Sequence, residues 1–106
     1  MVNLLETKDA FDAAIADGKV AVDFTATWCG PCKRIGPVFE RLAGENAGIK
    51  FFKVDVDKNA DAAEAEGITA MPTFKFYHGG KVIQDMVLQG ASEEKLKEMI
   101  QELNDL

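Results

Sequence analysis

Residues 28–32 read Trp28-Cys29-Gly30-Pro31-Cys32 and hold both cysteines of the 106-residue chain. In a helix, side chains three positions apart lie on one face, with Cβ atoms about 5–6 Å apart. A disulfide needs Cβ atoms about 3.5–4.5 Å apart, so a small adjustment can close or open a bond between Cys29 and Cys32. Closing so short a loop stabilises a fold by only about 2 kcal/mol. The spacing therefore favours a pair that switches between dithiol and disulfide over a structural crosslink.

The segments beside the cysteines predict which sulfur reacts first. Residues 20–26 form a nearly continuous apolar run, typical of a strand covered on both faces, and a helical pattern begins at about Pro31. Cys29 then lies near the N-cap of this helix, where unpaired backbone N–H groups and the helix dipole favour a thiolate. Cys32 lies one turn further in and should be more shielded. We therefore expect Cys29 to attack and Cys32 to resolve.

Cysteines at this spacing also occur in zinc sites. A structural zinc site needs four ligands, typically Cys and His. The only histidine, His78, lies far along the chain, at a turn where we expect it to be exposed and without function. We therefore expect no metal, and a site shared between two chains is the alternative left open. A redox pair beside a βαβ pattern is the favoured interpretation.

The rest of the chain alternates between strand and helix patterns. Strands are expected at residues 2–5, 20–26, 49–56, 74–77 and 82–88, and helices between Thr7 and Gly18, from Pro31 to Ala43 or beyond, at 60–66 and from Ser92 to Leu103. The order β-α-β-α-β-α-β-β-α predicts an α/β protein with a central mixed sheet and helices on both faces. The length predicts a single domain over residues 1–106.

Charged residues interrupt two of the buried strands. Asp23 lies inside the run at 20–26, where an unpaired charge is costly, so either the strand lets it reach water or it has a function. Lys53 lies in the next strand, and its flexible stem can carry the ammonium group to water. Asp55 and Asp57, toward the end of that strand, are expected to be solvated rather than catalytic. The residues alone leave both interpretations of Asp23 open.

Composition excludes other classes of function. The net charge is −6 and no basic run is present, so we expect no nucleic-acid partner. No apolar run reaches the ~18 residues of a membrane helix, so we expect no membrane association. Charge appears already at Glu6, too soon for the apolar core of a signal peptide. A full chain of this kind is expected in the cytoplasm, although a removed transit peptide would leave the same pattern.

Three motifs together carry a family resemblance: Trp-Cys-Gly-Pro-Cys-Lys at 28–33, Val22-Asp23-Phe24 before it, and Met71-Pro72-Thr73 much later. With them the chain resembles the thioredoxin family over essentially its whole length. The Gly30-Pro31 pair resembles thioredoxins rather than glutaredoxins or protein disulfide isomerases, which usually have other dipeptides there. One departure is Thr25, where many thioredoxins carry an aromatic residue. This difference affects packing beneath the loop and not the chemistry.

The resemblance implies the thioredoxin fold, a five-stranded mixed sheet flanked by four helices, and a general protein disulfide reductase. Cys29 and Cys32 would form its redox disulfide. Asp23 would lie buried beneath Cys32, with a raised pKa, and would accept the proton of Cys32. Lys53 would lie near Asp23 and temper that pKa. No bound cofactor is implied, and thioredoxin reductase, usually with electrons from NADPH, would restore the dithiol of a protein that we expect to be a monomer.

The resemblance also implies where a disulfide substrate docks. The Met71–Pro72 bond should be cis and lie against the disulfide, which frees the Met71 backbone to pair with an extended substrate segment. The expected apolar docking rim consists of Trp28, Gly30, Pro31, Met71, Pro72 and Gly90, with Ala91 beside it. Partial core packing is the alternative for Trp28, but its place next to Cys29 favours substrate contact.

Two other functions are weighed against this one. An oxidase or isomerase is disfavoured by the Gly30-Pro31 dipeptide and by the absence of a signal-peptide pattern. A binding subunit or chaperone-like module without redox turnover is disfavoured because Cys29, Cys32, Asp23 and Pro72 are all present. A Cys29→Ser variant separates the last alternative, since binding would survive the change and reduction would not.

Overall fold

The computed structural model describes residues 2–106, and its elements follow the predicted order. The strands are β1 (Asn3–Leu4), β2 (Lys19–Thr25), β3 (Ile49–Asp55), β4 (Thr73–His78) and β5 (Lys81–Gln89). The helices are α1 (Lys8–Ile15), α2 (Gly30–Glu45), α3 (Ala60–Ala65) and α4 (Glu93–Asn104). Each expected element is present, and its bounds differ from the prediction by at most two residues.

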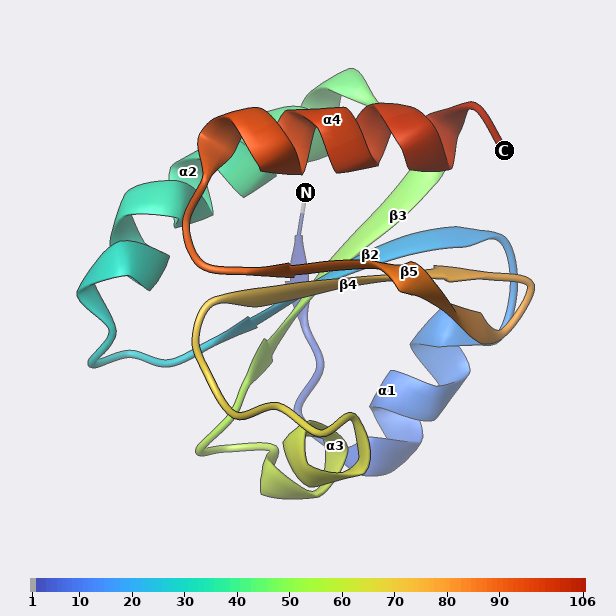
Figure 1. Ribbon diagram of the computed structural model, residues 1–106. Coiled ribbons are helices and arrows are strands. Elements are labelled where there is room, and N and C mark those ends of the chain that lie inside the picture. The colour runs from blue at the N-terminus through green and yellow to red at the C-terminus, as the bar shows by residue number, and fades with distance from the viewer. Residues whose placement is uncertain (1) are drawn as a thin grey trace.

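The five strands form one mixed sheet in the order β1-β3-β2-β4-β5. β3 runs parallel to β1 and β2, whereas β4 is antiparallel to β2 and β5 is antiparallel to β4. Helices α2 and α4 cover one face of this sheet, and α1 and α3 cover the other (Figure 1). The predicted mixed sheet with helices on both faces is therefore confirmed.

A separate aromatic cluster fills each side of the sheet. On the side of α2 and α4, the ring of Phe39 packs against Phe51 and Phe74, with centroids 5.1 and 5.5 Å apart. On the side of α1, the ring of Phe11 packs against Phe24 and Tyr77, at 6.0 and 5.9 Å. Because side chains alternate along a strand, the residues of β2 divide between these two clusters.

Each helix begins at a capping side chain that accepts a backbone N–H from its first turn. The caps are Thr7 for α1, Cys29 for α2, Asn59 for α3 and Ser92 for α4. Helix α2 continues through Pro37, which lies inside it. The cap of α2 is a cysteine, which is an unusual choice and places this sulfur at the helix N-terminus.

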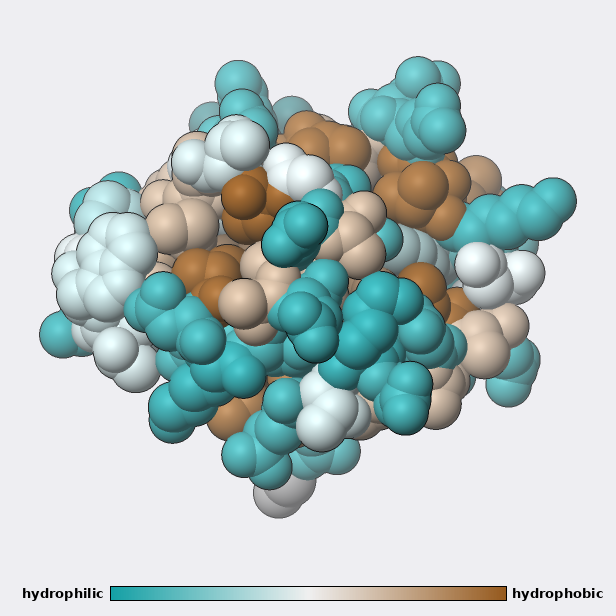
Figure 2. Space-filling model, turned by 90° about the horizontal axis from the view of Figure 1, so that it is seen from below, coloured by the Kyte–Doolittle hydropathy of each residue, from teal (hydrophilic) through white to brown (hydrophobic). Residues whose placement is uncertain are grey.

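The outer surface of α1 and α3 is mostly polar. Figure 2 shows hydrophilic side chains spread over this face, with apolar atoms visible in small separate patches. Within residues 2–106, none of the helices combines the length and the apolar character needed to cross a bilayer.

Candidate active site

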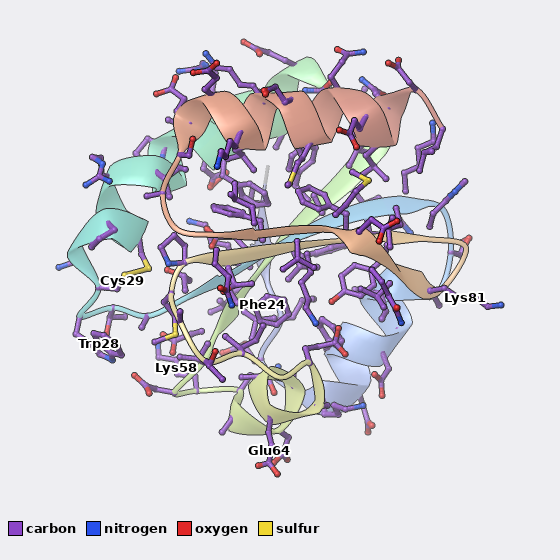
Figure 3. All side chains as sticks on the ribbon, in the orientation of Figure 1. Phe24, Trp28, Cys29, Lys58, Glu64 and Lys81 are labelled. Atoms are coloured by element: carbon purple, nitrogen blue, oxygen red, sulfur yellow. A yellow bond between two sulfur atoms is a disulfide. The ribbon has the colours of Figure 1, made fainter. Side chains whose placement is uncertain are left out.

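The two cysteines form a disulfide at the N-terminus of α2. Cys29 is the N-cap residue, and the backbone N–H of Cys32 donates to Cys29 Sγ across 3.2 Å. In Figure 3, Cys29 lies at one end of the molecule and Lys81, beside the β4–β5 turn, lies at the other. The expected N-cap position of Cys29 is confirmed, and the backbone geometry that favours a thiolate is in place.

The expected difference in shielding between the two cysteines is not present in this disulfide form. Cys29 is 5% exposed and Cys32 is 4% exposed. Both pack in a small apolar cluster with Ala26, against Met71. In the disulfide form both cysteines lie in this cluster, so the prediction that Cys32 is more shielded than Cys29 is not met here.

The loop before β4 meets the disulfide from the other side. The Met71–Pro72 bond is cis, as predicted, and Met71 O lies 3.7 Å from Cys29 Sγ. The N–H of Gly90 donates to Pro72 O across 2.9 Å, which joins the end of β5 to this loop. Gly90 has φ +103°, a conformation that a residue with a Cβ would adopt only with strain. Three segments distant in sequence therefore converge on the two cysteines.

The expected docking rim is exposed only in part. Gly30 and Pro31 are exposed, Met71 and Gly90 are half-buried, and Pro72 is buried. Ala91 is half-buried and packs on the apolar cluster beneath α2 and α4. Pro72 was expected in the docking rim, but its side chain is buried and supports the rim from below.

Trp28 is a surface residue held by a hydrogen bond. Its side chain is 64% exposed, and its Nε1–H donates to Asp57 Oδ2 across 2.8 Å. The alternative of core packing for Trp28 is therefore wrong. This role of Asp57 was not predicted from the sequence. The β-α-β order of the sequence is a partial signal, because the parallel strands of such a unit end at the same edge of the sheet; that β2 and β3 are direct neighbours is known only from the structure.

Asp23 is buried inside the sheet without a hydrogen bond for one of its oxygens. It is 1% exposed, and Oδ1 has no hydrogen-bond partner among the described residues. Ala21 packs on the α2 side of the sheet, so the alternation of β2 directs Asp23 toward the helix that carries Cys32. Burial raises the pKa of Asp23 to about 7, and the charge of Lys53, its register partner on β3, lowers it in part. The possibility that Asp23 reaches water is thereby excluded.

Asp55 is also buried, contrary to the prediction that it would be solvated. It is 6% exposed, and its Oδ1 accepts the backbone N–H groups of Asp57 and Lys58, at 2.9 and 3.2 Å. A carboxylate that accepts local backbone donors stabilises the turn after a strand. Asp57, by contrast, is exposed as predicted.

A cavity of about 770 Å³ opens beside the second cysteine. Cys32, Lys33 and Gly36 line it from α2, and Lys53 and Asp55 line it from β3. It brings Lys53 and Cys32 to one space. Within residues 2–106, the His, Cys, Asp and Glu side chains form no group of three that could hold a metal ion.

Comparisons with known proteins agree with this geometry. The family model described as Thioredoxin matches residues 2–102. The chain belongs to the thioredoxin family. It is 54% identical to a thioredoxin of Geodia cydonium over 103 residues, which covers 94% of this chain and 96% of that protein. It is 52% identical to an H-type thioredoxin of Chlamydomonas reinhardtii over 105 residues, covering 93% and 91%.

Solved structures of thioredoxins have the same architecture. A Plasmodium falciparum thioredoxin superposes with a TM-score of 0.92 at 41% identity, covering 95% of this chain and 98% of that one. A Malassezia sympodialis thioredoxin gives 0.89 at 41% identity, covering 98% and 91%. The thioredoxin fold is therefore shown, and the chain is a protein-disulfide oxidoreductase of a family that acts in dithiol–disulfide exchange. Its redox pair is Cys29 and Cys32.

Proposed function

We propose that this thioredoxin-family chain is a general protein disulfide reductase in which Cys29 attacks the substrate and Cys32 resolves. The observation that carries the assignment of roles is the position of Cys29 Sγ at the N-cap of α2, where it accepts the N–H of Cys32. In the reduced protein the same N–H and the helix N-terminus would stabilise a Cys29 thiolate. Cys32 lies inside the helix and has no such position.

The proposed reaction transfers two electrons to the substrate. The Cys29 thiolate attacks one sulfur of the substrate disulfide, forms a mixed disulfide, and releases the other sulfur as a thiolate that takes up a proton. Cys32 then loses its proton and attacks Cys29 Sγ. The second substrate sulfur leaves as a thiolate, which is protonated in turn, and the chain is left with the Cys29–Cys32 disulfide.

Asp23 is the proposed acceptor for the proton of Cys32. Its carboxylate lies on the α2 side of β2, and one of its oxygens has no hydrogen bond that would compete for a proton. With a pKa of about 7, Asp23 is partly ionised at neutral pH and can both take and return a proton. Lys53 supports this role, because its charge keeps part of the Asp23 population ionised.

The proposed substrate surface surrounds the disulfide. An extended segment of the substrate pairs with the Met71 backbone, whose carbonyl oxygen lies beside Cys29 Sγ. The exposed contacts are Trp28, Gly30 and Pro31, with the half-buried Gly90 and Ala91 at the far side. Pro72 supports the loop from below.

The remaining proposals concern the setting in which the reaction runs. Each turnover leaves the chain oxidised, so a reductant must restore the dithiol, and we assign this step to thioredoxin reductase with electrons from NADPH. Thioredoxins generally act on disulfide substrates and are reduced by this enzyme. Repeated cycling needs a reducing compartment, and we propose the cytoplasm. We propose a monomer with a single domain over residues 1–106.

The test compares the wild type with Cys32→Ser on insulin, which contains disulfides. We expect the reduced wild type to cleave them and to leave as the disulfide. Cys32→Ser should instead accumulate a mixed disulfide on Cys29, which intact-mass measurement and peptide mapping detect. The matched Cys29→Ser variant should form neither product nor adduct.

Two outcomes would contradict the proposed function or the proposed roles of the two cysteines. If the wild type neither turns over nor forms an adduct, while Cys29→Ser still binds insulin, the chain is a binding module. If the adduct forms on Cys32 in Cys29→Ser as fast as it forms on Cys29 in Cys32→Ser, the assigned roles are wrong.

A further inference from the structure

Three polar side chains meet where the Met71–Pro72 loop begins. Helix α3 ends at its C-cap residue Glu66, and β4 begins seven residues later. Lys75 Nζ donates to the backbone oxygen of Glu66 across 2.6 Å and lies 3.9 Å from Glu66 Oε1. Tyr77 Oη donates to the same Oε1 across 2.5 Å. We call Glu66, Lys75 and Tyr77 the loop clamp.

The loop clamp is largely removed from water. Tyr77 is 1% exposed, and the side chains of Lys75 and Glu66 are 17% and 19% exposed. A buried donor that loses its partner is costly, so each member holds the others in place. Burial, and then the hydrogen bond to Glu66, raise the pKa of Tyr77, which keeps its hydroxyl a donor at neutral pH.

The clamp fixes the start of the loop relative to the sheet. Lys75 belongs to β4, which is paired with β2 on one side and β5 on the other, so its backbone cannot move independently. Inside the loop, the N–H of Ile68 donates to Ala63 O across 3.0 Å, and Thr73 Oγ1 donates to Ala70 O across 2.6 Å. The side-chain bonds from β4 to Glu66 therefore close a ring of contacts around the segment that contains Met71.

We propose that Lys75, with Glu66 and Tyr77, positions the Met71 backbone for protein substrates and so favours disulfides that lie in an extended peptide segment. The inference rests on the proposed function above. Pairing with an extended segment is stronger when the receiving backbone is already ordered, because less conformational entropy is lost on binding. A small disulfide has no peptide segment to pair, so it should depend on the cysteines and hardly on the clamp.

Lys19 supplies a matched control at the opposite end of β2. Its Nζ also reaches from a strand to a carbonyl oxygen at a helix C-terminus, that of Asn104 in α4, across 2.7 Å. Lys19 lies in register with His78, at the end of the sheet remote from Met71. Lys75→Met and Lys19→Met therefore remove the same kind of interaction, and only the first touches the loop.

The experiment measures kcat and KM for insulin and for cystine, with wild type, Lys75→Met, Lys75→Arg, Lys19→Met and Tyr77→Phe. Lys75→Met loses hydrogen bonding of the usual strength. We therefore expect this variant to lower kcat/KM for insulin about fivefold to tenfold, chiefly through a higher KM. Its kcat/KM for cystine should change by less than about twofold, because the thiol chemistry is unaltered. Tyr77→Phe should show the same pattern more weakly, Lys75→Arg should restore most of the loss, and Lys19→Met should match the wild type on both substrates.

Three outcomes would overturn the inference. They are wild-type kinetics of Lys75→Met on insulin, an equal loss on both substrates, or the same loss in Lys19→Met. Should Lys75→Met not fold, Tyr77→Phe decides alone, with an unchanged insulin-to-cystine ratio counting against the clamp. Failure of the proposed function is distinguishable, because the wild type itself would then reduce neither substrate.

Discussion

Two aspartates on neighbouring parallel strands are both buried, but their carboxylates have different surroundings. Asp55, which ends β3, accepts two backbone N–H groups through Oδ1. Asp23, inside β2, leaves its Oδ1 without a partner among residues 2–106. Hydrogen bonds from the backbone satisfy a carboxylate and make it part of a turn. A carboxylate without them is costly to ionise and therefore well suited to accept a proton.

The largest expected effect is on the pH dependence of stability through Asp23. Its folded-state pKa of about 7 lies above the ordinary value of 3.8, so the folded form holds the proton that the unfolded form releases. The stability associated with protonated Asp23 is fully present below about pH 4 and is lost as pH rises to about 7. Removing the charge with Asp23→Asn should raise the unfolding free energy at pH 8 by up to about 4 kcal/mol, since one pKa unit is worth about 1.4 kcal/mol.

Denaturant unfolding of the oxidised protein at a series of pH values checks this expectation. The gain from Asp23→Asn should shrink steadily as the pH falls below 7 and disappear below the unfolded pKa of 3.8, where the folded and unfolded forms of the wild type are both protonated. A gain that is the same at pH 8 and pH 4 would show that packing, rather than ionisation of Asp23, causes the difference.

A second effect separates resolution from initial attack. Proton acceptance by a positioned group typically accelerates a step about a hundredfold or more, so Asp23→Asn should slow release of the substrate from the mixed disulfide by about that factor near neutral pH. Formation of the mixed disulfide by Cys29 should change much less. The wild-type resolution rate should rise with pH through about 7, as Asp23 ionises, and the variant should lack this rise.

Rapid-mixing kinetics with acid quench and mass analysis resolve the two steps. Equal resolution rates in wild type and variant across pH would remove Asp23 from the mechanism. Equal slowing of both steps would mean that Asp23 maintains the structure of the site and does not accept the proton of Cys32.

The sequence was sufficient wherever a local pattern determines the structure. The apolar runs of β2 and β3 predict buried strands, and the position of Cys29 between a strand and a helix predicts its N-cap role, which the structure confirms. The family resemblance predicted the cis bond before Pro72, which no local pattern specifies.

The features that the sequence did not give depend on partners from elsewhere in the chain or from the backbone. Asp55 accepts two N–H groups of the turn after β3, and the path of the backbone there decides whether its carboxylate faces the turn or the solvent. The contact between Glu66 and Tyr77 spans eleven residues and depends on where β4 lies in the sheet. Trp28 and Asp57 meet because two parallel strands end together, which requires knowing the strand order.

The smallest expected effect tests the other half of the comparison, at Asp55. Asp55→Ala leaves the N–H groups of Asp57 and Lys58 without their acceptor, which should lower the unfolding free energy by about 2 kcal/mol at pH 8. Asp55→Asn keeps an acceptor oxygen in the same place and should lose less than half of that. The sign is opposite to that at Asp23, although both changes remove a buried carboxylate, because one carboxylate is satisfied by hydrogen bonds and the other is not. A stabilised Asp55→Ala variant would mean that burial alone governs both sites, and the distinction between them would fail.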